Sequence, residues 1–210
     1  MKTARADKIT LTSCMRNEGI FVLEWIAYHQ CLGFDELLIV TNDCTDHSDS
    51  LLDLLAEQGV ITHIRQTLAP GDNPQNAGMD LALTHLRSNG TTWCLHIDSD
   101  EFLLVETGAG QLTDLLPHVE GADVVPITWR NFGDNGLTDW TPGDNVLERF
   151  TRAQAQAEPG ESKSKCLFRV ASFARATDHN PRDPLVPDPR VMTPDGEALS
   201  NKTLLQGRSS

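Results

Sequence analysis

The strongest chemical signal in the chain is a pair of carboxylates, Asp98 and Asp100, which directly follow the apolar run 92–97. Because a chain turns at the end of a strand, both carboxylates can face one ligand. Hard divalent cations such as Mg²⁺ or Mn²⁺ bind a few carboxylate oxygens and take further ligands from substrate phosphates. A cation held there would neutralise a diphosphate leaving group. Aspartate is also a common turn residue, so the pair alone is a weak signal.

Two other polar segments also follow apolar strands. Asn17 and Glu18 come after the predicted strand 8–13, and Asp43 lies in the polar turn after the predicted strand 36–41. Glu18 can accept hydrogen bonds from a base or sugar edge, and Asp43 can read a nucleobase N–H. The alternatives are capping of the next helix for Asn17 and Glu18, and turn formation for Asp43.

Asn76 and Gly78 open a predicted helix over 77–86. Backbone N–H groups at a helix N-terminus favour anions, which makes Asn76 a candidate ligand-binding residue. Gly78 allows close approach of a ligand or a strand, or simply close packing.

Strands and helices alternate along the first two thirds of the chain. Strands are predicted at 8–13, 36–41, 60–64, 92–97 and 123–129, and helices lie between them, one of them capped by Ser48. This alternation predicts an α/β fold with a parallel sheet and helices on both faces. In such sheets ligands bind beyond the carboxyl ends of the strands, where every polar segment named above falls.

The pattern weakens after Gly133. Residues 153–165 read as a loop, residues 165–173 as one more strand, and the Pro-rich stretch from Asp178 onward as extended or disordered. We therefore expect one domain over 1–180 and a C-terminal tail over 181–210.

Composition excludes several classes of protein. The 210 residues carry a formal net charge of -13, which argues against broad nucleic-acid binding. No apolar run reaches the roughly 18 residues of a membrane span, and the N-terminus lacks the apolar region of a signal peptide, so cytoplasmic residence is expected. Five cysteines without a CxxC motif favour neither a disulfide framework nor a zinc site.

The order of these motifs resembles that of the GT-A fold glycosyltransferases of the family 2 kind, and more closely the family 2-like subgroup related to family 92. The resemblance is carried by MRNEGIFVLEWIAYHQCLGFDELLIVTNDCTD, HIDSDEFL and WRNFGDNG. It covers roughly residues 8–180. Each motif is weak, but four of them in order, each at a strand end, are fairly specific.

This resemblance implies a nucleotide-sugar donor, a divalent metal (Mn²⁺ or Mg²⁺) and transfer to a hydroxyl of a glycan, lipid-linked or small-molecule acceptor. If the roles of the family's motif residues are carried over to this sequence, Glu18 and Asp43 contact the nucleoside, and Asp98 lies near the ribose and the metal. Asp100 ligates the metal and a later histidine, His179, completes its shell. Lys165 and Arg169 meet the diphosphate or an acidic acceptor, or are plain surface charges.

Inversion at the anomeric carbon needs a base within hydrogen-bond reach of the acceptor hydroxyl. The acidic residues after the fifth strand are the candidates, namely Asp134, Asp139, Asp144 and Glu148. We select Asp134, because it follows a segment that looks like the family's acceptor side. Trp140 can stack on a sugar face or pack in the interior.

Two alternatives remain open. Asn42 stands where the family has an aspartate, and the chain ends soon after His179, which suggests an inactive or truncated nucleotide-binding protein. A phosphatase of the haloacid dehalogenase kind also places two such aspartates after a strand. That class usually has Thr or Val where this chain has Phe102, and its motif opens the fold, whereas here three strands precede it.

Overall fold

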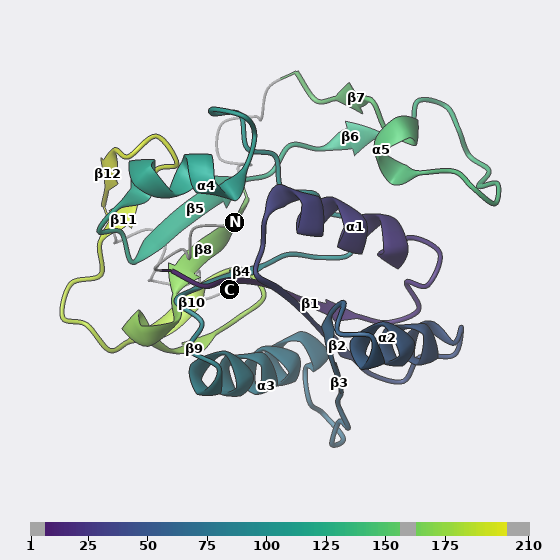
Figure 1. The fold of residues 1–210 in the computed structure, drawn as a ribbon, viewed down its shortest axis with the longest axis horizontal. Helices are drawn as coiled ribbons and strands as arrows, with labels where there is room; N and C mark the ends of the chain where they lie inside the picture. Colours follow the sequence, from purple (N-terminus) through teal and green to yellow (C-terminus); the bar gives the residue numbers. More distant parts are fainter. Residues whose placement is uncertain (1–6, 156–162, 201–210) are drawn as a thin grey trace.

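The computed structural model describes residues 7–155 and 163–200, which form an α/β fold around an eight-stranded sheet (Figure 1). The strand order is β12-β11-β5-β8-β4-β1-β2-β3. The strands are β1 (Ile9–Met15), β2 (Glu36–Thr41), β3 (Thr62–Arg65), β4 (Trp93–His96), β5 (Val124–Thr128), β8 (Ser164–Arg169), β11 (Val191–Met192) and β12 (Ala198–Leu199). Strands β1 to β4 pair in parallel, and β8 is antiparallel to both β4 and β5. The prediction of a mostly parallel sheet is confirmed.

Helices cover both faces of the sheet, as predicted. They are α1 (Val22–Leu32), α2 (Ser48–Glu57), α3 (Pro74–Ser88), α4 (Leu112–Leu115) and α5 (Val146–Arg149), with 3₁₀ turns η1 (Leu116–Val119) and η2 (Val170–Ser172). In β2, Leu37 and Ile39 join the core under α1, α2 and α4, whereas Leu38 joins the core under α3. Figure 1 shows α1 and α3 on opposite sides of the sheet. This double burial explains why the strand reads as a continuous apolar run.

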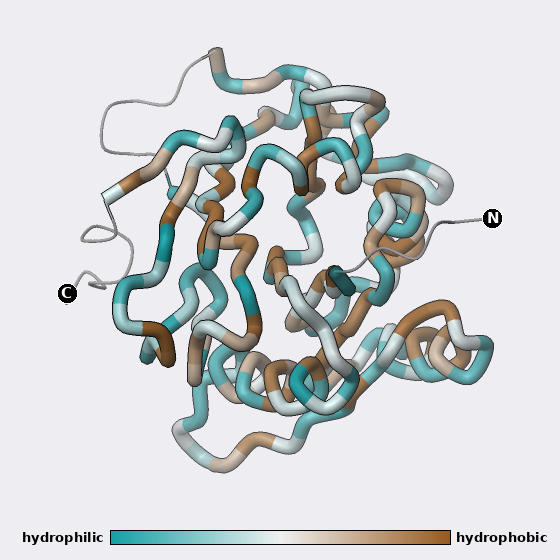
Figure 2. Tube along the Cα trace, turned by 60° about the vertical axis from the view of Figure 1, so that its left-hand side comes forward, coloured by the Kyte–Doolittle hydropathy of each residue, from teal (hydrophilic) through white to brown (hydrophobic). Residues whose placement is uncertain are grey.

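Hydrophobic stretches gather along the central strands in Figure 2, and hydrophilic stretches along the outer loops. Among residues 7–155 and 163–200, no helix is long and apolar enough to cross a bilayer.

Two small hairpins flank the sheet. Strands β6 (Phe132–Gly133) and β7 (Arg152–Ala153) enclose α5, and we call residues 132–153 the α5 segment. The Glu24 carboxylate on α1 accepts the N–H groups of Val146 (2.6 Å) and Leu147 (3.0 Å) and so holds this segment in place. Strands β9 (Phe173–Ala176) and β10 (Pro181–Pro184) form the second hairpin, which contacts α3.

Two elements differ in detail from the prediction. Helix α2 begins at Ser48 rather than being capped by it, because the Asp46 carboxylate accepts both the N–H (3.0 Å) and the hydroxyl (2.6 Å) of Ser48. The predicted strand 165–173 is divided by η2 into β8 and β9.

The stretch predicted as an extended or disordered tail contains ordered strands. Its strand β11 pairs with β5 in the main sheet, where Val191 lies opposite Val124. Short strands without hydrophobic periodicity gave no signal in the sequence, because their order depends on partners far along the chain. Residues 201–210 of the predicted tail lie outside the described residues.

Candidate functional site

The loops that follow β1, β2 and β4 converge on Glu18. Burial raises the pKa of the Glu18 carboxyl, a hydrogen bond with Ser99 opposes the rise, and the nearby Asp100 and Asp46 carboxylates add to it. These interactions place Glu18 beside both the second strand's loop and the loop that carries the two aspartates. The meeting of these loops at the carboxyl edge of the sheet is what the sequence predicted.

The first two loops are fastened to each other by Asn17 and Asp46. The Asn17 amide accepts the Thr45 N–H (2.7 Å) and donates to the Thr45 hydroxyl (3.1 Å), and the Asp46 carboxylate accepts the Gly19 N–H (3.1 Å). Asn17 has a φ of 62°, in the left-handed region that non-glycine residues seldom adopt. The Asn17 side chain therefore holds the loops in place.

Asp43, the other predicted donor contact, has an exposed side chain and a φ of 47°. One of its carboxylate oxygens accepts the Asn42 amide at 3.2 Å. Because the side chain is exposed, the Asp43 carboxylate remains accessible to a ligand at the loop after β2.

Asp98 is paired with a buried lysine on β8. The Lys165 ammonium lies 3.0 Å from Asp98 Oδ2, 3.2 Å from the Asp178 carbonyl and 3.8 Å from Glu101. The Lys165 side chain is 2% exposed, whereas the Asp98 side chain is 33% exposed. The face of Trp129 lies 5.7 Å from the ammonium. Sequence reasoning predicted a lysine that meets the donor, but it gave no sign that the ammonium is enclosed against Asp98.

Three buried polar atoms beside this pair have no hydrogen-bond partner within the described part of the chain: Asp98 Oδ1, His96 Nε2 and Trp129 Nε1. The other His96 nitrogen lies 3.1 Å from the Thr12 hydroxyl. Burial, reinforced by the positive charge of Lys165, holds the pKa of His96 well below its usual range, so the ring is neutral. Unpaired buried polar atoms usually mark places where a ligand, ion or water is expected.

Of the residues proposed for the metal, Asp98 pairs with Lys165, and His179 follows Asp178, whose carbonyl accepts from Lys165. Asp100 is exposed next to Glu18, and the ring of His179 lies 3.3 Å from the Asp178 carboxylate and 5.4 Å from the ring of Trp129. Within residues 7–155 and 163–200, no cluster of three or more His, Cys, Asp or Glu side chains is arranged to hold a metal ion by itself. The carboxylates of Asp98, whose Oδ1 is unpaired, and Asp100 are of the ligand type that Mg²⁺ and Mn²⁺ prefer, and His179 and phosphate oxygens would supply the remaining ligands.

Glu101 is a site residue that sequence reasoning did not single out. It accepts the Asp98 N–H at 2.9 Å. Burial raises the Glu101 pKa to about 7, with the Asp98 and Asp100 carboxylates adding to the rise and the Asp98 N–H and Lys165 opposing it. The sequence did contain a signal for Glu101, because it is the third acidic residue of the segment that carries Asp98 and Asp100.

Helix α1 holds the loop after β4 with three aromatic side chains. Trp25 Nε1 donates to the Glu101 carbonyl (3.0 Å), Tyr28 donates to the Leu103 carbonyl (2.8 Å), and His29 Nε2 accepts the Leu103 N–H (3.3 Å). Because Nε2 accepts, Nδ1 carries the proton and donates to the Trp25 carbonyl at 2.8 Å. The spacing i, i+3, i+4 places the three side chains on one face of α1, but only the structure shows that this face binds backbone groups.

The start of α3 packs tightly on β1. A Cβ on Gly78 would lie 2.3 Å from Cys14 Sγ, so close packing against a strand is the reason for this glycine. The Asn76 N–H is used by the capping side chain of Asn73 at 3.0 Å. Asn76 lines a cavity of about 290 Å³ together with the β9–β10 hairpin.

Asp134 lies in the turn after β6, on the α5 segment. Its side chain is exposed, and Oδ1 accepts the Gly136 N–H at 2.8 Å. Among the other predicted bases, Asp144 pairs with Arg149 at 2.5 Å. Trp140 packs edge to face with Phe21, with ring centroids 6.4 Å apart. The hydrogen bond of Asp134 is local, and its role as a base remains a prediction.

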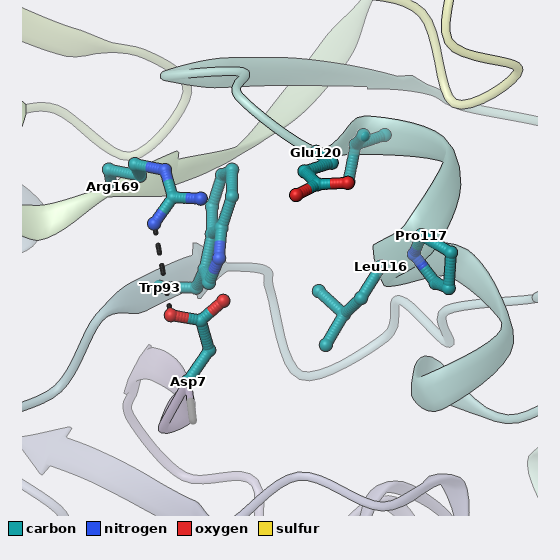
Figure 3. A pocket seen from close by; sticks show the side chains of 7 residues that line it. Asp7, Trp93, Leu116, Pro117, Glu120 and Arg169 are labelled. Atoms are coloured by element: carbon teal, nitrogen blue, oxygen red, sulfur yellow. Dashed lines mark ion pairs between the residues drawn. The ribbon is translucent and has the colours of Figure 1, made fainter. Parts of the chain in front are cut away.

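A second cavity lies at the other end of β4 (Figure 3). It measures about 320 Å³ and is lined by Asp7, Trp93, Leu116, Pro117, Val119, Glu120 and Arg169. Arg169 stacks over Trp93 at 4.3 Å and forms an ion pair with Asp7 at 3.8 Å. Arg169 pairs with the first residue of β4, whereas Asp98 follows the last. Arg169 thus lies at the opposite end of β4 from Asp98, which favours those of its alternatives that do not place it with Lys165 at the diphosphate.

The architecture is that of GT-A glycosyltransferases. The structure of residues 1–349 of TarS from S. aureus aligns with a TM-score of 0.50 at 15% identity, covering 78% of this chain and 47% of that chain. The mannosyltransferase PcManGT from Pyrobaculum calidifontis, solved in complex with GDP-Man and Mn²⁺, aligns with a TM-score of 0.43 at 17% identity over 56% of this chain and 34% of that chain.

The model of glycosyltransferase family 92 matches residues 10–194, and the chain belongs to this family. A family 92 protein of Ricinus communis is 28% identical over 156 residues, which are 72% of this chain and 27% of the relative. One of Arabidopsis thaliana is 24% identical over 188 residues, covering 85% of this chain and 32% of the relative. The chain thus spans about a third or less of the length of these two relatives.

Proposed function

We propose that this domain transfers a sugar from a nucleotide-sugar donor to an acceptor hydroxyl, with inversion at the anomeric carbon and dependence on Mn²⁺ or Mg²⁺. The observation that carries the proposal is the joining of the loops after β1 and β2 by Asn17 and Asp46 at the carboxyl edge of the sheet that also carries Asp98, in a chain of glycosyltransferase family 92. Ligands of open α/β sheets bind at this edge. The acceptor is a glycan, a lipid-linked sugar or a small molecule.

The nucleoside is assigned to the joined loops after β1 and β2. Glu18 and Asp43 offer carboxylate oxygens to base and ribose, while Asn17 holds the two loops together through Thr45. Asn76 is assigned to the donor side at the start of α3. These contacts suit a nucleoside, whose hydroxyl and N–H groups are hydrogen-bond donors.

The diphosphate is assigned to Asp98, Asp100 and His179, which would hold the cation. When bound, the cation neutralises the charge that develops on the leaving diphosphate. Lys165 contributes a fixed positive charge that is already in place before the reaction, because its ammonium is buried against Asp98. Its effect on the donor therefore acts through the position and charge of Asp98.

The transfer is a single displacement. The acceptor oxygen forms a bond to the anomeric carbon while the bond from that carbon to the diphosphate oxygen breaks, and the hydroxyl proton goes to a base. We assign the base to Asp134 on the α5 segment. Glu24 and the contact between Phe21 and Trp140 attach this segment to the start of α1, close in the chain to Glu18.

The test is a thermal-shift screen of nucleoside diphosphates with and without Mn²⁺, followed by turnover of the matching nucleotide-sugar. A ligand that binds only the folded state raises the melting temperature. Asp100→Ala should abolish the Mn²⁺-dependent shift and leave the melting temperature of the ligand-free protein unchanged. Asp195→Ala removes the same charge from an exposed position after β11 and should change neither.

Unchanged donor affinity in Asp100→Ala would remove this aspartate from the mechanism. A metal-dependent shift without transfer or hydrolysis of the nucleotide-sugar would instead support the alternative of a nucleotide-binding domain that is inactive by itself. The small share of its relatives' length that the chain covers motivates this second reading.

A further inference from the structure

The hairpin of β9 and β10 places two guanidinium groups opposite each other. Arg175 and Arg182 are directly paired across the strands, so their side chains leave the same face of the hairpin. Like charges in this position destabilise a hairpin. The chain carries a net charge of -13, so a general excess of basic residues does not account for the pair.

Both arginines line the cavity of about 290 Å³ that the hairpin forms with the start of α3. The remaining lining residues are Asn76, Ala176, Thr177 and Asp183. Asn76 belongs to the first turn of α3, a helix of 15 residues whose N-terminal end is electrically positive.

The charges in this Arg175–Arg182 cavity are only partly balanced. Asp183 is the one carboxylate among the lining residues. Arg175 lies 3.7 Å from Asp80, in a pair where its own side chain is 62% exposed. Such an exposed pair is weak and screened by solvent, so the Arg175 guanidinium can exchange Asp80 for an anion bound in the cavity. An anion bound between the two guanidinium groups would remove their mutual repulsion.

The cavity borders the edge of the sheet that carries Asp98. Thr177 lines it, and the carbonyl of the next residue, Asp178, accepts the Lys165 ammonium that pairs with Asp98. On the α3 side, the Gln75 carbonyl accepts the Cys14 thiol at 3.8 Å near the end of β1. The cavity is therefore connected to Asp98 through Thr177, Asp178 and Lys165.

We propose that the Arg175–Arg182 cavity binds an anionic group, phosphoryl or carboxylate, of the acceptor. Guanidinium groups bind the oxygens of both groups through paired N–H bonds. Binding of the anion rests on the cavity alone, whereas its assignment to the acceptor rests on the proposed function. The donor diphosphate is assigned elsewhere, to the two aspartates and their cation, which leaves the arginines for a second anion.

The test measures binding of three sugars: glucose 6-phosphate, glucuronate and glucose. Each is titrated against the protein saturated with Mn²⁺ and the nucleoside diphosphate that gives the largest thermal shift, so that the donor site is filled. We expect glucose 6-phosphate, glucuronate or both to bind, and glucose to bind at least tenfold more weakly. Preference for one anion over the other distinguishes a phosphorylated acceptor from a carboxylated one.

Arg182→Gln should weaken binding of the anionic sugar about tenfold or more and leave the nucleotide-dependent shift unchanged, because charged hydrogen bonds are lost only in the cavity. Arg190→Gln removes the same charge beside the start of β5 and is the matched control. The ligand-free melting temperature of Arg182→Gln should stay the same or rise, since a cross-strand repulsion is removed.

Equal affinity for glucose and the anionic sugars would overturn the proposal. So would loss of the nucleotide shift in Arg182→Gln, which would place the donor diphosphate in the cavity. If Arg182→Gln lowers the ligand-free melting temperature, anion binding is measured in Arg175→Gln instead. Unchanged anion affinity in Arg175→Gln would then contradict the proposal. Absence of any nucleotide shift in the wild type would contradict the proposed function, while anion binding that depends on Arg182 would still support the cavity.

Discussion

Removing Asp98 should destabilise the fold more than removing Lys165. The Lys165 side chain is 2% exposed, so Asp98→Asn leaves an ammonium enclosed in protein, with Glu101 at 3.8 Å as a distant substitute. Breaking a buried pair by removing one partner costs about 3–5 kcal/mol, and the presence of Glu101 puts Asp98→Asn near the low end, at about 3 kcal/mol.

Lys165→Met leaves the carboxylate of Asp98, whose side chain is 33% exposed. Water can replace part of the lost interaction, and methionine fills most of the volume of the lysine stem. The expected cost is about 1–2 kcal/mol. The double variant Asp98→Asn/Lys165→Met should be more stable than the sum of the single changes predicts, because it buries no unpaired charge.

Urea unfolding at pH 7 in buffer without divalent cations measures these differences, and the coupling energy should exceed about 1 kcal/mol. Asp195→Asn, at an exposed position, is the control and should change the unfolding free energy by less than about 0.5 kcal/mol. Equal costs for the two single variants, or a greater cost for Lys165→Met, would refute the reasoning that the ammonium is the more deeply buried charge.

Two further predictions concern the elements that position the site. Gly78→Ala should cost about 1–3 kcal/mol in urea unfolding, because the new methyl group meets Cys14 Sγ, and Cys14→Ala should restore most of the loss. Burial lowers the His29 pKa from 6.5 to about 4 while the Trp25 carbonyl opposes the shift, so the folded state keeps a neutral ring. The unfolded state takes up the proton first, so stability should fall by about 3 kcal/mol between pH 6.5 and 4, and a His29→Asn variant should show a shallower fall in urea midpoint.

The central strands could be read from the sequence because each is buried on both faces. The strand Glu36–Thr41 has the predicted bounds, and the polar turns after β1, β2 and β4 lie at one edge of the sheet as expected. Local apolar runs and turn residues are sufficient for such elements, since parallel strands share the direction of their carboxyl ends.

The place of β8 could not be read in this way. The sequence predicts a strand over 165–173, but the insertion of β8 between β4 and β5, antiparallel to both, depends on pairing across about 70 residues of chain. That insertion buries Lys165 against Asp98 and turns Arg169 toward Trp93 at the other end of β4. The same argument holds for β11, whose pairing with β5 brings part of the predicted tail into the sheet.

The amino-acid sequence alone determined the class of fold, the edge of the sheet where the proposed site lies and the aspartates at that edge, because all three follow from local patterns repeated along the chain. Only the tertiary structure decided which charge faces Asp98, that three aromatic residues of α1 hold the loop after β4, and that Arg175 and Arg182 oppose each other. These are contacts between residues far apart in the chain, and they are fixed by strand register and packing rather than by the residues that surround each position.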